Sequence, residues 1–175
     1  MNSDWMMPDD IFTWIETNIK QGESVLEFGS GHGSIKLAKH YNLFSVEHDE
    51  EWIGISDSTY IHAEIEENVI SAENNQKGWY NESIIREVLK ANNIVLFIID
   101  GPPGGIGRHG LLSLLDVLPQ SAFYVVDDIH REEELDLFNK LERWHCGKSK
   151  TFTALYDSGK ERKWGVLLPL IGGDS

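Results

Sequence analysis

The sequence is poor in cysteine and has no long apolar run. Its single cysteine, Cys146, cannot form an internal disulfide and cannot supply a thiolate metal cluster. No uninterrupted apolar stretch approaches the roughly 18 residues of a membrane span. Residues 1–4 also lack the basic region and apolar run that open a secretory signal. We therefore expect a reducing, cytoplasmic setting.

Basic side chains are scarce relative to acidic ones. Fifteen Lys and Arg against 29 Asp and Glu give the 175 residues a formal net charge of −14. The strongest basic cluster, residues 160–163, contains Glu161. Because such a chain repels phosphate backbones and anionic lipid surfaces, we expect neither nucleic acids nor membranes as partners.

The rest of the composition is that of a globular domain. Hydrophobic residues make up 41% and charged residues 25% of the chain, which are ordinary values for a folded protein. The length fits one domain, and no linker or internal repeat interrupts it. We expect a single domain over residues 1–175, with an N-terminal helix within residues 1–22.

Strand and helix patterns alternate along most of the chain. Apolar runs predict strands at residues 24–28, 43–46, 59–62, 94–99, 122–126, 150–156 and 164–168. Helical periodicity predicts helices at residues 9–20, 35–40, 50–56, 82–91, 110–118 and 131–144. This order indicates an α/β fold with a doubly wound, mostly parallel seven-stranded sheet that ends in an antiparallel hairpin strand.

Two segments carry narrower expectations. In the last helix, Leu135, Phe138 and Leu141 are expected to face the core. The segment 64–80 is polar and rich in Asn, and we expect an irregular loop there on the substrate side.

A glycine-rich turn follows the first predicted strand. Gly29, Gly31 and Gly33 alternate after Glu27, so the backbone can turn sharply and approach a ligand near the next helix N-terminus. Glu47 ends the second strand 18 residues after Gly29, where a carboxylate can accept hydrogen bonds from ribose hydroxyls. The pattern predicts a nucleoside-binding site, although such a turn can also serve close strand–helix packing alone.

The glycine spacing separates two kinds of nucleoside ligand. Dinucleotide-binding folds prefer a third glycine three positions after the second, but here Ser34 holds that position and the third glycine, Gly33, comes two after the second. A nicotinamide-dependent oxidoreductase is therefore disfavoured.

The segment 27–33 resembles motif I of class I S-adenosylmethionine (SAM)-dependent methyltransferases, and residues 46–49 resemble their second motif. The resemblance implies a Rossmann-like fold, with Glu27 orienting the methionine amino group and with Ala63 and Glu64 flanking the adenine. The full set that it gives for cofactor binding is Glu27, Gly29, Gly31, Gly33, Glu47, His48, Ala63, Glu64 and Asp100.

Three aspartates follow neighbouring strands. Asp100 ends the fourth predicted strand, and Asp127 and Asp128 end the fifth. Because adjacent parallel strands lie about 4.8 Å apart, these carboxylates should converge on one rim of the sheet. Hard oxygen ligands suit Mg²⁺ or another divalent cation. The alternative is that Asp127 or Asp128 caps the following helix.

This triplet also resembles the ligand set of small metal-dependent O-methyltransferases of the catechol and macrolide-sugar types, which implies that Asp100, Asp127 and Asp128 bind the metal. Catechol-type enzymes place a lysine base three positions after the first aspartate. Pro103 stands there in this sequence, so the base must come from elsewhere.

Histidines are the other sources of a base. His130 follows the acidic pair and could accept a proton at neutral pH, or it could be an exposed residue at a helix start. His109 is the second choice. The expected catalytic set is His130, Asp100 and Asp127.

Aromatic and basic residues near the motifs leave alternatives open. Trp79 and Tyr80, with Trp5 and the segment 6–7, could form a lid over the acceptor or anchor a loop to the core. Arg108 could bind a substrate carboxylate or phosphate, or pair with a surface glutamate.

Together these features predict a SAM-dependent methyltransferase that acts on a hydroxyl of a small molecule or sugar, assisted by Mg²⁺. The alternative is a SAM-binding partner subunit without catalysis. The sequence leaves the acceptor and the oligomeric state open.

Overall fold

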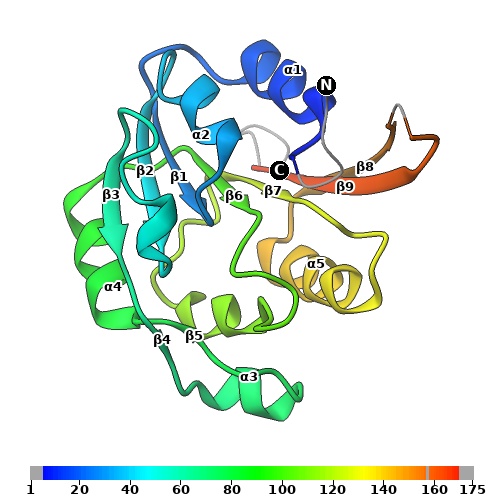
Figure 1. Cartoon of the computed structure of the whole chain (residues 1–175). Coiled ribbons are helices and arrows are strands. Elements are labelled where there is room, and N and C mark those ends of the chain that lie inside the picture. The colour runs from blue at the N-terminus through cyan, green and yellow to red at the C-terminus, as the bar shows by residue number, and fades with distance from the viewer. Residues whose placement is uncertain (1–5, 157, 170–175) are drawn as a thin grey trace.

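The computed structural model describes residues 6–156 and 158–169. Seven strands form the main sheet: β1 (Ser24–Phe28), β2 (Asn42–Glu47), β3 (Thr59–His62), β6 (Leu96–Ile99), β7 (Phe123–Val126), β8 (Lys148–Leu155) and β9 (Glu161–Leu168). Their order is β3-β2-β1-β6-β7-β9-β8. The first five are parallel, and β9 runs antiparallel to both β7 and β8 (Figure 1). The predicted fold class, including the C-terminal hairpin, is confirmed.

Helices flank the sheet on both sides. They are α1 (Asp9–Asn18), α2 (His32–Leu37), α3 (Val69–Glu73), α4 (Glu82–Ala91) and α5 (Glu132–His145), with 3₁₀ turns η1 (Glu50–Trp52) and η2 (His109–Leu114). Local signals explain their ends: the Asn81 side chain accepts a hydrogen bond from Ile84 N at the start of α4. Cys146 ends α5 in the left-handed conformation, with φ of 59°. No helix in the part of the chain that the structure describes is long and apolar enough to cross a membrane.

The strands alternate between two hydrophobic clusters. In β1, Val25 packs into the cluster that contains Ile11 and Phe12 of α1, whereas Leu26 points into the cluster on the other face, with Leu137 of α5. The same alternation along β6 and β7 follows from the two-residue period of a strand. Figure 1 accordingly shows α1 and α2 on one side of the sheet and α4 and α5 on the other. The carboxyl ends of the parallel strands lie at the edge of the sheet between these two helix layers.

Three helical predictions were wrong in detail. The helix expected at residues 50–56 is only the 3₁₀ turn η1. The helix expected at residues 110–118 is the short 3₁₀ turn η2. Leu135 of α5 is 42% exposed, whereas Phe138 and Leu141 are buried. A helix advances about 100° per residue, so residues three apart point about 60° away from each other around the helix axis. The face of α5 that packs on the sheet is centred on Leu137 and Leu141, and Leu135 lies beside it.

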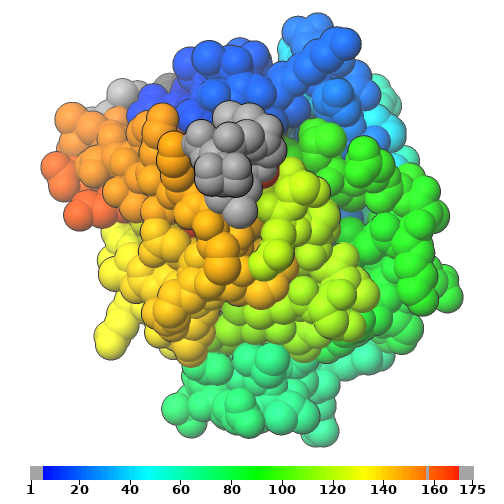
Figure 2. Space-filling model, turned by 180° about the vertical axis from the view of Figure 1, so that it is seen from behind, coloured from blue at the N-terminus to red at the C-terminus, as the bar shows by residue number. Residues whose placement is uncertain are grey.

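The segment 64–80 contains more regular structure than expected. It forms a two-stranded antiparallel ribbon, β4 (Ile65–Glu66) and β5 (Trp79–Tyr80), with α3 between the strands. Both whole-molecule views show α3 projecting from the body of the protein (Figures 1 and 2). Trp79 and Tyr80 are each 1% exposed, so they anchor this projection to the core.

Candidate active site

A cavity of about 490 Å³ opens at the carboxyl ends of the parallel strands. Its walls come from the turn after β1, the turn after β2, the loop after β6 and the segment after β7, with Arg162 from β9. Ligands of doubly wound sheets bind at this edge, where the strand order reverses. Here the reversal lies between β1 and β6, whose turns both contribute to the cavity wall.

The glycine turn after β1 is built for close backbone approach. Gly29 has φ of +90°, and a Cβ there would lie 2.9 Å from Gly101 Cα in the loop after β6. A Cβ on Gly101 would lie 2.7 Å from Gly29 Cα. Gly31 differs, because a Cβ there would meet no atom of the described residues within 4 Å, although Gly31 lines the cavity. Gly31 therefore leaves open space for a ligand against the backbone.

Glu27 lies at the base of this turn. It is 2% exposed, lines the cavity, and its Oε1 accepts hydrogen bonds from Ser34 Oγ at 2.5 Å and Ser45 Oγ at 2.6 Å. Burial raises the pKa of Glu27 to about 7, against the lowering effect of the two hydroxyls, and the nearby Glu47 raises it further. A cationic ligand group in the cavity would stabilise the charged form.

Glu47 is held by three backbone N–H groups. Its Oε1 accepts from His48 N at 2.7 Å and from Asp49 N at 2.9 Å, and its Oε2 accepts from Ser30 N at 2.8 Å. The carboxylate is 3% exposed and lines the cavity. His48 Nδ1 also lies 2.9 Å from Oε1. Since each carboxylate oxygen has about two acceptor positions, Oε2, which accepts from Ser30 N, keeps one for a ligand hydroxyl. Glu47 thus joins the turns after β1 and β2 as well as facing the site.

The residues that the resemblance assigned to the adenine lie elsewhere. Ala63 is fully buried and Glu64 is exposed, and neither lines the cavity. The cavity wall near the turn after β2 is formed instead by His32, His48, Asp49 and Trp52. Trp52 is 38% exposed and packs edge to face on His32 at 5.7 Å. A tryptophan soon after the second acidic motif is the signal in the sequence that could have indicated this wall.

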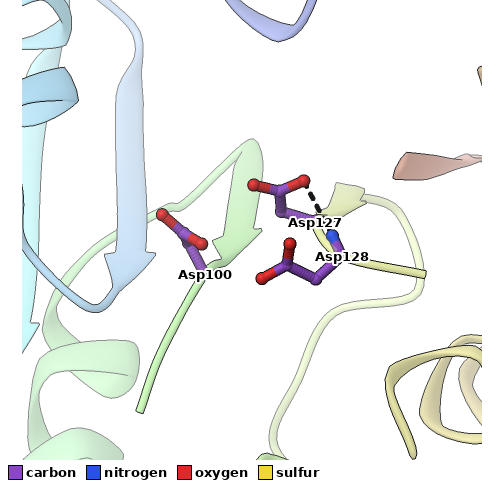
Figure 3. Close-up of side chains that lie close together, drawn as sticks. All are labelled: Asp100, Asp127 and Asp128. Atoms are coloured by element: carbon purple, nitrogen blue, oxygen red, sulfur yellow. Dashed lines mark hydrogen bonds between the residues drawn. The ribbon is translucent and has the colours of Figure 1, made fainter. Parts of the chain in front are cut away.

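The three aspartates after β6 and β7 converge as predicted. One oxygen of each of Asp100, Asp127 and Asp128 lies within 4.8 Å of the others (Figure 3). Asp127 is fully buried, and its Oδ1 accepts a hydrogen bond from Asp128 N at 2.7 Å. Asp100 retains 30% side-chain exposure and lines the cavity.

Arginines that the sequence analysis did not connect with the triplet surround it. Arg162 Nη2 donates to Asp127 Oδ2 at 2.8 Å and to Asp128 Oδ1 at 2.5 Å. Arg108 Nη2 donates to Asp128 Oδ2 at 3.3 Å and to the Asp100 carbonyl at 2.8 Å. Arg131 Nη1 lies 3.1 Å from Asp128 Oδ2. Arg108 therefore neither faces a surface glutamate nor stands free for a substrate anion.

The charges of the rim act on one another. Burial raises the pKa of Asp100 well above its usual value, and Asp127 raises it further while Arg108 opposes the shift. Burial and the charge of Asp128 raise the pKa of Asp127 to about 6, against the effect of Arg162. Like charges in a buried cluster hinder one another's ionisation, and guanidinium groups relieve that repulsion.

The rim does not fit a divalent cation with its arginines in these positions. Asp127 and Asp128 direct carboxylate oxygens to Arg162, and Asp128 directs its second oxygen to Arg108 and Arg131. A metal ligand needs those lone pairs directed to the ion. The expected convergence is therefore confirmed, whereas the ligand role stays a prediction that this hydrogen bonding does not favour.

The two histidines considered as bases lie outside the cavity wall. His130 is exposed, and its Nδ1 accepts a 3.4 Å hydrogen bond from Lys163 N. Partial burial lowers its pKa, while Asp128 acts in the opposite direction. His109 is buried on η2, with Nε2 2.7 Å from Asp136 Oδ2 and Nδ1 2.9 Å from Gln76 Nε2. Both of its nitrogens thus serve contacts away from the cavity.

Two residues of the N-terminal segment contribute to the cavity wall. Met6 and Met7 line it, and the Met6 carbonyl accepts hydrogen bonds from Tyr156 Oη at 2.8 Å and Arg162 Nη1 at 3.1 Å. Trp5 lies outside the described residues. Arg162 therefore connects the acidic rim with the N-terminal residues of the cavity wall.

No known protein-family profile and no curated protein sequence matches the chain, but solved structures do. An O-methyltransferase from Bacillus cereus, in complex with SAH, has a TM-score of 0.57 and 12% identity over 93% of this chain and 82% of that one. The O-methyltransferase TomG from Streptomyces achromogenes, involved in tomaymycin synthesis and in complex with SAM, gives 0.51 and 15% over 85% and 74%. An rRNA methylase from Streptococcus thermophilus gives 0.51 and 10% over 94% and 98%.

At these identities the similarity is one of fold. The strand order, the antiparallel C-terminal hairpin and the cavity at the carboxyl ends of β1, β2 and β6 are features of this chain's own structure. The chain therefore has the Rossmann-like fold of the class I SAM-dependent methyltransferases.

Proposed function

We propose that this chain is a SAM-dependent methyltransferase that acts on a hydroxyl of a small molecule or sugar. The observation that carries this proposal is the open space at Gly31 between the buried carboxylates Glu27 and Glu47. It lies at the edge of the sheet where ligands of this fold bind. The Bacillus cereus and Streptomyces achromogenes structures, which contain SAH and SAM, support the choice of cofactor.

The cavity offers complementary groups for each part of SAM. Glu27 would hold the cationic amino group, and the remaining acceptor position of Glu47 would hold a ribose hydroxyl. We place the adenine against Trp52, since aromatic faces stack on bases and Trp52 lines this end of the cavity. Trp52 thus takes the position that the resemblance gave to Ala63 and Glu64.

When bound, SAM supplies an electrophilic methyl group on a sulfonium. The chain has to hold the acceptor hydroxyl close to it and in line. Asp100, Pro103 and Gly104 line the part of the cavity next to the glycine turn, and we assign the acceptor to them. Asp100 is the group that would accept the hydroxyl proton, because it lines this part of the cavity and keeps 30% of its side chain exposed.

Cofactor binding can be tested by filling the open space at Gly31. Gly31 has extended backbone, with φ of −166°, so a valine can adopt its conformation, and its Cβ would meet no atom within 4 Å in the part of the chain that the structure describes. In titration calorimetry we expect Gly31→Val to weaken SAM and SAH binding at least about tenfold, or about 1.4 kcal/mol. The melting temperature of the free protein should change little.

Gly105→Val is the matched control. A Cβ on Gly105 also meets no atom within 4 Å, and this glycine does not line the cavity. Absence of SAM and SAH binding by the wild type would refute the proposed cofactor. Binding without turnover on any hydroxyl acceptor, together with co-purification of a second chain, would favour a partner subunit without catalysis.

A further inference from the structure

We propose that guanidinium groups occupy the place of a divalent cation at the acidic rim, and that the rim of Asp100, Asp127 and Asp128 binds no metal ion. This inference concerns the rim alone and does not depend on the proposed methyl transfer. It departs from the metal-dependent enzymes whose aspartate triplet this sequence resembles.

The distribution of arginine supports it first. The chain has five arginines, and three of them, Arg108, Arg131 and Arg162, lie within 3.3 Å of an oxygen of Asp128. Arginines are few relative to the 29 acidic side chains, so three arginines beside one group of aspartates is a marked concentration. Three guanidinium groups beside three aspartates give the rim its own counterions.

The topology explains how Arg162 reaches the rim. β9 runs antiparallel to β7, with Gly165 opposite Val126, so the first residues of β9 lie beside the carboxyl end of β7. Arg162 is near the start of β9, and its side chain is directed to Asp127 and Asp128. The strand that ends the fold thereby delivers a cation to the point where two carboxylates meet.

Burial makes this arrangement hard to exchange for a metal. The side chains of Arg162 and Asp128 are 5% and 4% exposed, and Asp127 is fully buried. A divalent cation between these carboxylates would have to move Arg162 away from both of them. It would also break the Arg162 hydrogen bond to the Met6 carbonyl. Removing one partner from a buried ion pair leaves an uncompensated charge, which is strongly unfavourable.

Mn²⁺ titration of the EDTA-treated full chain, followed by electron paramagnetic resonance, tests the inference. The wild type and Asp100→Asn should bind Mn²⁺ equally and weakly, through dispersed surface carboxylates only. Binding by the wild type that is tenfold or more tighter than binding by Asp100→Asn would overturn the inference, and this comparison needs no change at an arginine.

Arg162→Gln provides the converse test. Without the guanidinium, the three carboxylates should gain a Mn²⁺ site at least tenfold tighter than any in the wild type, and adding Asp100→Asn should abolish it. Lys163→Gln is the matched control, because it removes the same charge from the neighbouring exposed residue of β9. Circular dichroism checks folding, and a folded Arg162→Gln that gains no Mn²⁺ binding would show that the guanidinium does not occupy a cation site.

Discussion

Two buried glutamates at one edge of the sheet have different hydrogen-bonding environments. Among the described residues, Glu27 accepts hydrogen bonds only from two side-chain hydroxyls, both on Oε1, and burial raises its pKa. Glu47 accepts three backbone N–H groups on two oxygens. The same residue type at equal depth therefore has hydroxyl partners in one place and backbone partners in the other. Such a difference is invisible in the sequence, where both appear simply as acids at strand ends.

Replacing Glu27 by glutamine should stabilise the cofactor-free protein at pH 8. The folded pKa of about 7 exceeds the ordinary value of 4.5, so the protonated form favours folding below pH 4.5 and this contribution is lost as the pH rises through 7. At pH 8 the wild type carries the full cost of a buried charge, on the order of 3 kcal/mol at about 1.4 kcal/mol per pKa unit. Glutamine keeps an oxygen for both hydroxyls and carries no charge.

Urea unfolding at pH 8 and at pH 5 measures the effect. The difference between Glu27→Gln and the wild type should shrink markedly at pH 5, where more of Glu27 is protonated. The exposed Glu51 offers a control, since Glu51→Gln should leave stability nearly unchanged at both values. If Glu27→Gln destabilised the protein at pH 8, the buried charge would not be the dominant effect.

At the scale of elements, Glu47 is the connection between two turns. Its carboxylate receives Ser30 N from the turn after β1 and His48 N and Asp49 N from the turn after β2. In Glu47→Gln, one oxygen becomes an NH₂ group, which cannot accept from a backbone donor. Since an unsatisfied buried donor costs roughly 1–3 kcal/mol, we expect the free energy of unfolding at pH 7 to fall by about that amount.

The same variant should loosen the glycine turn locally. Hydrogen exchange of the Ser30 amide should accelerate in Glu47→Gln relative to Glu51→Gln. Unchanged exchange at Ser30 would mean that the turn keeps its shape through the backbone contact between Gly29 and Gly101, without help from Glu47.

The elements that the sequence predicted best are those with strong local patterns. The run 94–99 is apolar throughout, and its β6 is buried on both faces. The helix 82–91 was predicted with its observed bounds. The prediction for segment 64–80 failed because its order depends on partners distant in sequence. The Lys77 amide donates to the Ile106 carbonyl, and the Gln76 side chain accepts a hydrogen bond from His109 N.

The candidate site, like the fold, was predictable where a local sequence pattern indicates it. Spacing predicted that Glu27, Gly31 and Glu47 lie near the carboxyl ends of the first two strands, and the structure places them in the cavity wall there. The rim arginines were not identifiable in this way. Arg162 and Asp127 are 35 residues apart, and they meet only because the final hairpin reverses direction. Periodicity indicates a hairpin but not which of its side chains reaches the rim.

At the scale of the whole molecule, the net charge of −14 bears on the choice of acceptor. The fold is shared with both O-methyltransferases and an rRNA methylase, so fold alone does not distinguish these acceptors. Proteins that bind RNA through phosphates present basic side chains on an accessible surface. Here Arg108 and Arg162 are each 4% exposed and engaged with aspartates, so neither is presented to a polyanion.

We therefore expect no measurable binding of single-stranded or duplex RNA, even at about 50 mM salt, where the release of counterions favours such binding most. Fluorescence anisotropy with labelled RNA measures it, with and without SAM, and a basic RNA-binding domain serves as the positive control. Charge-reducing variants on the exposed face of α5, such as Glu132→Gln with Glu133→Gln, separate two causes of a negative result. If only that variant bound RNA, repulsion by the overall negative charge would be what prevents binding by the wild type. If the wild type itself bound RNA and the binding weakened steeply with salt, the chain would have a phosphate-binding surface. The proposal of a small-molecule acceptor would then lose its main support.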